Sequence, residues 1–337
     1  MKTITIAGGG LAGLSLGIAL RRRGVPVVLH EAGDYPRHKV CGEFMAGTTP
    51  GLTDRLGLSD ILQQGVFNRS SVWFARGREV LRRSLPLPVP GISRHKLDAA
   101  MAGLFCELGG DLRVGSTRAG EPREGWVLAT GRPPGEPRWI GLKAHFAGVE
   151  TVADLEMHLG RGGYAGLARI EEGWVNVCGL FRTRRLKKRT DAGILPDYLD
   201  ACGLAGLADR LRPARQREGS GKAVARMGFS RFHSPPGILA IGDACAAIPP
   251  FTGNGMTMAL ESADTAVGPL TFFAEGQLEW SDTIRQTRHL LNQRFGHRLR
   301  AARVLHPLPT RLGQLPFPLM RVAGSLIPFN LLYRALH

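Results

Sequence analysis

The stretch that decides the fold is KTITIAGGGLAG, residues 2–13. Residues 2–7 alternate β-branched and small side chains, as a buried strand does, and a glycine-rich turn follows at once. A helix is predicted over 14–23, because its apolar spacing ends in three arginines followed by Gly24, which are typical of a helix C-terminus. A second strand is expected over 25–30. The chain therefore begins with a strand–helix–strand unit.

Three glycines of this turn, Gly8, Gly10 and Gly13, have the spacing used to bind dinucleotides. Gly8 permits the tight turn, Gly10 lets the backbone approach a pyrophosphate, and Gly13 lets the helix pack closely on the strand. The helix N-terminus at Leu11 and Ala12 then faces the phosphates with its positive dipole end. The turn therefore predicts a dinucleotide site.

Two further segments bear on the kind of dinucleotide. Glu31 closes the second strand, where its carboxylate would accept hydrogen bonds from the adenosine ribose. This unit alone does not separate FAD from NAD. Far along the chain, residues 237–244 (GILAIGDA) form an apolar strand ending at Gly242-Asp243. A Pro-rich turn and a predicted helix follow, with Pro250, Gly253, Asn254, Gly255 and Met256.

This distal segment resembles the second FAD fingerprint of the glutathione-reductase-type flavoproteins, in the branch of aromatic hydroxylases (flavin monooxygenases), geranylgeranyl reductases and flavin halogenases. The resemblance implies FAD as cofactor, with Asp243 on the ribityl chain and the helix after Gly255 pointing at the flavin pyrimidine. A helix N-terminus stabilises the negative charge that reduced flavin carries near N1 and O2. We therefore expect a raised redox potential.

A third segment, YPRHKVCGE at 35–43, is similar to the Pro-Arg-x-Lys-x-Cys-Gly stretch of geranylgeranyl reductases, which runs alongside the flavin. The resemblance implies that Arg37, Lys39, Cys41 and Gly42 lie at the cofactor site. That pattern often continues with glycine, whereas this chain has Glu43, whose role stays open.

Another stretch, 92–101, matches the family's arginine-then-helix element, so Arg94 is expected near the cofactor.

Three residues are catalytic candidates: Lys143, Glu43 and Cys41. A lysine near flavin would stabilise developing negative charge or orient an anionic substrate. Lys143 and His145 lie on one expected strand, and we expect only one of them to face the flavin. Cys41 could be a nucleophile if Arg37 and Lys39 stabilised its thiolate. The favoured interpretation is a cysteine packed against flavin.

The fold class expected is α/β: a glutathione-reductase-type Rossmann FAD-binding domain, an antiparallel-sheet substrate domain and a helical C-terminal tail. The FAD-binding domain is assigned to 1–70, 91–150 and 220–275, the substrate domain to 71–90 and 151–219, and the helical region to 276–337. A hairpin is predicted at 164–181, with its turn at Glu171-Glu172-Gly173. This strand pair would cover the flavin.

Composition limits the setting and the partners. The five cysteines form no Cys-x-x-Cys pair, no signal peptide precedes the first strand and no run reaches the length of a membrane span. We therefore expect a cytoplasmic protein without a metal site. The formal net charge of +16 attracts anionic partners, so an acidic carrier protein or peripheral contact with an anionic membrane is an alternative functional feature. Nucleic acid is not expected, because no recognition motif supports it.

Sequence motifs that mark known subfamilies are absent from this chain, and their absence bears on which reaction it catalyses. Residues 163–169 (GYAGLAR) stand where similar halogenases have Trp-x-Trp-x-Ile-Pro, so halogenation is disfavoured. The same residues also lack the Trp-x-Phe-Pro of geranylgeranyl reductases. Residues 129–135 (ATGRPPG) replace the Gly-x-Asp-Gly of aromatic hydroxylases. The leading hypothesis is an FAD-dependent oxidoreductase of secondary metabolism. It would reduce a double bond of, or hydroxylate, a bulky hydrophobic isoprenoid or polyketide-like substrate. The alternative is an NADH- or NADPH-dependent flavin monooxygenase of an aromatic compound.

Overall fold

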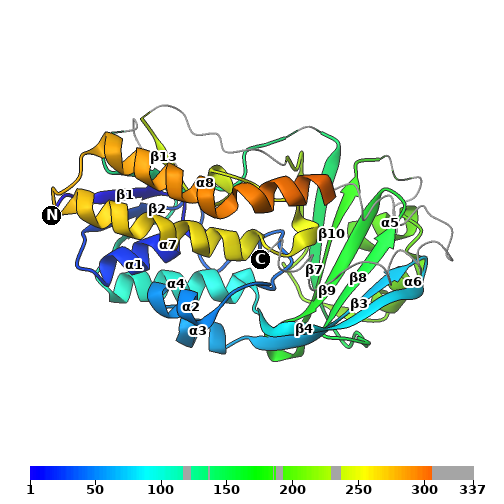
Figure 1. Ribbon diagram of the computed structural model, residues 1–337. Helices are drawn as coiled ribbons and strands as arrows, with labels where there is room; N and C mark the ends of the chain where they lie inside the picture. Colours follow the sequence, from blue (N-terminus) through cyan, green and yellow to red (C-terminus); the bar gives the residue numbers. More distant parts are fainter. Residues whose placement is uncertain (117–122, 136, 185, 187–192, 229–236, 306–337) are drawn as a thin grey trace.

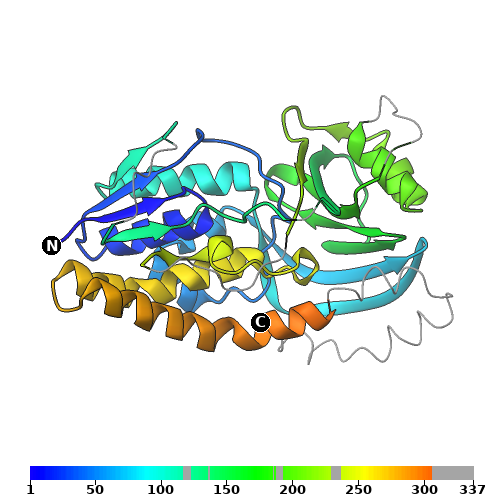
Figure 2. The same ribbon diagram turned by 90° about the horizontal axis from the view of Figure 1, so that it is seen from above.

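The computed structural model describes residues 1–305, apart from 117–122, 136, 185, 187–192 and 229–236. These residues form two units side by side, one built on a five-stranded sheet and one on an eight-stranded sheet (Figures 1 and 2). The fold class is the expected one.

The first unit is built on a parallel sheet. Its strands lie in the order β13 (Leu239–Ala240), β6 (Trp126–Leu128), β1 (Ile4–Ala7), β2 (Val27–His30) and β5 (Asp111–Arg113). All four residues of β1 are buried, as in a parallel sheet covered on both faces. The chain leaves β1 toward β2 on one side and returns to β6 on the other. Such a reversal leaves a ligand crevice at the carboxyl ends of the strands.

Helices cover this sheet and extend beyond it. They are α1 (Leu11–Arg21), α2 (Pro50–Leu56), α3 (Ser59–Gln63), α4 (Arg94–Glu107), α7 (Gly255–Ala274) and α8 (Trp280–Leu305). Helix α1 packs against α4 and α7, and α7 packs along α8 (Figure 1). Ten consecutive residues of α1 are buried, because helices flank it on two sides.

The second unit is built on a mixed sheet. Its order is β11 (Arg215–Gln216), β7 (Trp139–Ala147), β10 (Val175–Arg182), β9 (Gly163–Arg169), β8 (Leu155–Gly160), β3 (Val66–Ala75) and β4 (Arg78–Gly91), with β12 (Lys222–Ala225) also paired to β7. The β3–β8 pair is parallel and the others are antiparallel. Prolines at every second position from Pro86 to Pro90 suit β4 to the sheet edge, where a missing N–H costs no ladder bond.

Two short helices, α5 (Ile194–Ala201) and α6 (Ala205–Leu211), belong to a core shared with β7, β9 and β10. Leu142, Ala144 and Phe146 point into this core from one face of β7. Lys143 and His145 therefore lie on the opposite face, which is turned toward the first unit.

The expected strand–helix–strand unit is confirmed, as is the hairpin of β9 and β10 with its 3-10 turn (Glu171–Gly173). Two strands expected with the FAD-binding segments, β7 and β12, instead pair within the second sheet, where an eight-residue ladder holds β7 to β10. The domain bounds themselves stay predictions.

The expected helical region begins with α8, and residues 306–337 lie outside the described part. In the described residues, no helix combines the length and apolar character needed to cross a membrane.

Candidate functional site

A pocket of about 660 Å³ opens where the parallel strands end, which is within the usual size of cofactor sites. Ala7, His30, Ala129 and Asp243, which follow or end four strands of the sheet, all line it. This pocket therefore lies where the strand order predicts a ligand crevice.

The glycine turn forms one wall, and two of its glycines cannot carry a side chain. Gly8 has φ of 114°, and a Cβ there would lie 2.3 Å from the Ala129 carbonyl oxygen. A Cβ on Gly13 would lie 1.9 Å from the Gly8 carbonyl oxygen. The turn thus brings the N-terminus of α1 to the pocket at Leu11 and Ala12.

Helix α1 presents its positive dipole end there. Its N-cap is Gly10, which provides no side-chain acceptor, and its first turn holds no acidic residue. Backbone donors at such a terminus suit a diphosphate. The N-terminus of α1 therefore fits the dinucleotide that the sequence predicts.

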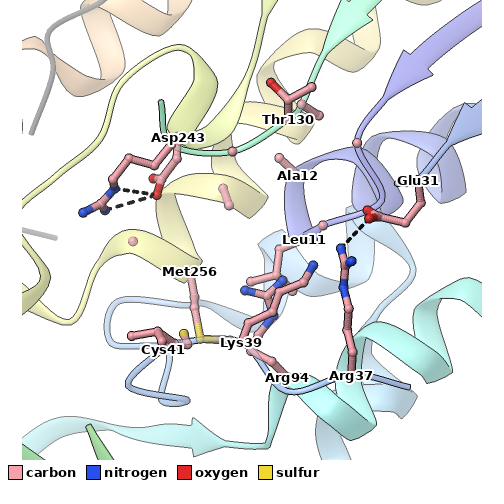
Figure 3. Close-up of a pocket in the computed structure, with 18 of the residues that line it drawn as sticks. Leu11, Ala12, Glu31, Arg37, Lys39, Cys41, Arg94, Thr130, Asp243 and Met256 are labelled. Atoms are coloured by element: carbon pink, nitrogen blue, oxygen red, sulfur yellow. Dashed lines mark hydrogen bonds and ion pairs between the residues drawn. The ribbon is translucent and has the colours of Figure 1, made fainter. Parts of the chain in front are cut away.

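Glu31 stands at one end of the pocket (Figure 3). Its carboxylate accepts hydrogen bonds from the backbone N–H of Gly9 at 2.7 Å and of Gly33 at 3.0 Å, and pairs with Arg37. Burial alone would raise the pKa of Glu31, but these hydrogen bonds and the charges of Lys39 and Arg37 hold it below its ordinary value. The group is therefore an ionised acceptor, as binding of ribose hydroxyls requires.

Three cationic side chains, Arg37, Lys39 and Arg94, line the middle of the pocket (Figure 3). The guanidinium of Arg94 donates twice to Asp98, at 2.7 Å each, and Lys39 Nζ lies 2.9 Å from the same carboxylate. Asp98 is fully buried, so this network fixes the direction of both cations. Cations beside a helix N-terminus provide the charge that a diphosphate needs.

Asp243 stands at the opposite end, in the 3-10 turn Gly242–Ala244 after β13. The guanidinium of Arg132 reaches its Oδ2 at 3.1 Å and also donates to the Ile248 carbonyl at 3.3 Å. A second 3-10 turn, Pro250–Thr252, leads to α7, whose first residues Gly255 and Met256 line the pocket. Two helix N-termini therefore face one pocket.

The structure brings together nearly all the predicted cofactor residues. Three of them do not line the pocket and instead shape it from behind. Gly13 packs on Gly8, Gly242 donates to the Ser262 hydroxyl at 2.9 Å, and Asn254 is the N-cap of α7.

Other lining residues were missed by sequence reasoning. Arg132 lies within the 129–135 segment, where the sequence showed only the absence of an aspartate, and His30 pairs with Ser116 at the Glu31 end.

Cys41 lines the pocket, as a cysteine packed against a cofactor would. Burial raises the pKa of its thiol, and the charge of Arg94 offsets only part of that effect. Arg37 and Lys39 are paired with Glu31 and Asp98. These contacts favour a protonated, packed thiol over a nucleophile.

Glu43 and Lys143 are paired with each other behind the wall of the pocket, and neither lines it. Lys143 Nζ lies 2.9 Å from Glu43 Oε1, and His145 Nε2 lies 2.5 Å from Oε2. The expectation that only one of Lys143 and His145 would face this side was wrong, because residues two apart on a strand share a face.

Comparisons with known proteins agree with the fold. No protein-family model matches the chain. It is 23% identical to a menaquinone reductase from Mycolicibacterium smegmatis, over 96% of this chain and 91% of that protein.

Three solved structures share the fold of this chain. The flavin-dependent brominase Bmp2 has 18% identity and a TM-score of 0.72, covering 96% of this chain and 94% of Bmp2. The p-nitrophenol 4-monooxygenase PnpA from Pseudomonas putida DLL-E4 has 13% identity and a TM-score of 0.74, covering 100% of this chain and 97% of PnpA. CtdE, in complex with FAD and a substrate, has 15% identity and a TM-score of 0.68, covering 96% of this chain and 91% of CtdE.

The fold is that of the Rossmann-type FAD-binding flavoenzymes. The two-ended pocket and the relative that aligns over almost the whole chain are those expected of an FAD-dependent oxidoreductase.

Proposed function

We propose that the protein uses FAD to reduce a double bond or to hydroxylate a bulky apolar substrate of the isoprenoid or polyketide class. The observation that carries this proposal is the single pocket between Glu31 and Asp243, which the N-termini of α1 and α7 both face. Bound FAD would supply hydride transfer.

The chain's own residues would hold and orient that cofactor. Glu31 accepts from the adenosine ribose, the N-terminus of α1 binds the diphosphate, and Asp243 accepts from the ribityl chain. The α7 N-terminus then stabilises negative charge at the far end of the flavin.

An apolar boundary supports an apolar substrate. Met227 lines the pocket and packs against a buried cluster that contains Tyr164, Leu180 and Phe251. This cluster joins the second sheet to the turn before α7. A substrate that reaches the pocket from this side would meet the Met227 side chain, which this buried apolar cluster supports from behind.

Reduction is the preferred reaction. The relative that aligns over almost the whole chain is named a menaquinone reductase, which supports a quinone or another isoprenoid compound as substrate. Hydroxylation of an aromatic ring with NADH or NADPH as electron donor is the second candidate, favoured by the shared fold with p-nitrophenol 4-monooxygenase.

The test is flavin reduction without oxygen, first with NADH and then with NADPH, followed by a quinone or isoprenoid acceptor. Oxidation of the reduced enzyme by the acceptor under anaerobic conditions supports the reductase. Product formation that requires oxygen, with one oxygen consumed per hydroxylated product, supports the monooxygenase. Purified protein that neither carries nor binds FAD would contradict both.

A further inference from the structure

A buried charged cluster lies directly behind the flavin end of the pocket. Gly42 and Phe44 both line the pocket, while Glu43 between them does not. The Glu43 side chain instead turns toward the second sheet, where it meets Lys143 and His145. Only one layer of backbone therefore separates this carboxylate from the pocket.

The cluster is closed to solvent. The side chains of Glu43, Lys143 and His145 are all 0% exposed. The backbone N–H of Arg94 also donates to Glu43 Oε1 at 3.0 Å, so both carboxylate oxygens are engaged. Burial would raise the pKa of Glu43, but the hydrogen bond from His145 and the charge of Lys143 lower it, so Glu43 is ionised at neutral pH.

The backbone of Cys41 and Gly42, which forms the wall between the cluster and the pocket, is held by hydrogen bonds. Asn176, the strand partner of His145, donates from Nδ2 to the carbonyls of Cys41 at 3.0 Å and of Gly42 at 2.8 Å. The charges thus keep a constant position relative to the pocket.

Two further imidazoles complete the surroundings. His38 Nδ1 lies 3.3 Å from Lys143 Nζ, and the His38 ring stacks on His95 with centroids 4.4 Å apart. Burial and the charge of Lys143 lower the pKa of His38 to about 3, and burial with the charge of Arg217 lowers that of His95. The His38 imidazole is therefore neutral at physiological pH, and the opposite charges of Glu43 and Lys143 dominate the cluster.

This arrangement is costly for a merely structural contact. Glu43 has φ of 58°, in the left-handed region that glycine adopts without strain. Burying an ion pair also costs desolvation that its attraction only partly offsets. Glycine at position 43 together with an apolar residue at position 143 would avoid both costs, so an electrostatic role of the pair accounts for its presence.

We propose that the Glu43–Lys143 pair sets the redox potential of the flavin bound in the pocket, as a neutral pair of charges placed behind the Cys41–Gly42 wall. The inference rests on the proposed function, since it requires bound FAD. Charges act strongly across a dry protein layer, and flavin gains negative charge on reduction. Both residues are positioning residues, because neither touches the pocket.

The proposal predicts opposite shifts for the two halves of the pair. Glu43→Gln leaves the ammonium uncompensated, which stabilises reduced flavin and makes the potential more positive. Lys143→Met leaves the carboxylate uncompensated and makes it more negative. Each change should alter the equilibrium between oxidised and reduced flavin at least tenfold, which is about 30 mV for a two-electron couple. The double variant should return close to the wild-type potential.

The potential is measured on FAD-bound protein by equilibration with a reference dye, at the same pH for the wild type and all variants. Glu156→Gln is the matched control. Glu156 is also buried, with Arg210 at 2.9 Å and His158 at 2.8 Å, but it lies on the opposite face of the second sheet. The flavin potential of the Glu156→Gln variant should equal that of the wild type.

The outcomes separate the two proposals. Wild-type protein that binds no FAD overturns the proposed function. If the wild type and a variant bind FAD, equal potentials in the two overturn the inference alone, as do shifts of the same sign in both single variants. Either single variant suffices if the other does not fold.

Discussion

Arg132 and Asp243 form an ion pair at one end of the pocket, with Nη2 3.1 Å from Oδ2, although 111 residues separate them in sequence. Arg132 follows β6 and Asp243 follows β13, and these neighbouring parallel strands end at the same edge of the sheet. The pairing fixes the carboxylate that we expect to meet the ribityl chain. It also ties the turn at Ile248 to the pocket.

Removal of this guanidinium should weaken FAD binding. We expect Arg132→Ala to raise the FAD dissociation constant about tenfold, the scale of one charge-assisted hydrogen bond. Arg132→Lys should lose less, because it keeps the charge but not the two-pronged geometry. Fluorescence titration of apoprotein with FAD measures both. Wild-type affinity in Arg132→Ala would show that the pair does not organise the site.

The half-buried thiol of Cys41 should be unreactive. Its raised pKa keeps it protonated at pH 7.5, and alkylation requires the thiolate. Iodoacetamide treatment of apoprotein, followed by peptide mass spectrometry, should label the exposed Cys106 first and leave Cys41 largely unmodified. Labelling of Cys41 as fast as Cys106 would instead favour the nucleophile interpretation.

The Glu43 carboxylate should stabilise the fold in a pH-dependent way. Its folded-state pKa is lowered, so its contribution is present above the unfolded value of about 4.3 and is lost as pH falls through the folded value. Glu43→Gln should therefore cost about 3–5 kcal/mol of unfolding free energy at pH 7 and progressively less below pH 4.

Urea unfolding at pH 7 and below pH 4 measures this loss of unfolding free energy, with Glu79→Gln as control. Glu79 forms an exposed pair with Arg82 and should contribute less than about 1 kcal/mol. A cost for Glu43→Gln that stays constant with pH would contradict the assigned ionisation.

Gly13→Ala should damage both the fold and the site. Its Cβ would meet the Gly8 carbonyl oxygen at 1.9 Å, and backbone cannot yield as a flexible side chain does. We expect a loss of about 1–3 kcal/mol and weaker FAD binding. Gly103→Ala, in α4 with nothing within 4 Å of the new Cβ, should instead stabilise by up to about 1 kcal/mol. Thermal unfolding of the two variants compares them, and equal effects would refute the packing argument.

Local patterns predicted much of the cofactor site. The β1–α1–β2 unit forms from neighbouring residues, so its periodicity and its glycines are visible in the sequence. Asp243 was placed at the site by the resemblance of its strand and Gly-Asp turn to the second FAD fingerprint, and it lines the pocket.

Features that depend on distant pairing were not predicted. Strand β7 joined the second sheet through β10, which follows three strands later in the chain. The contact between Glu43 and Lys143 spans 100 residues, and no local pattern at either position indicates it. Arg132 was not predicted either, because its partner Asp243 lies 111 residues further along the chain.

The central claim is that FAD binds between the Gly8–Gly13 turn and Asp243, and FAD affinity of the Asp243→Ala variant tests it most directly. Titration of apoprotein with FAD, followed by flavin fluorescence, compares this variant with the wild type and with Glu156→Gln. We predict tight binding by the wild type and the control, and at least a tenfold loss in Asp243→Ala. Unchanged affinity in Asp243→Ala, or no FAD binding by the wild type, would contradict the account.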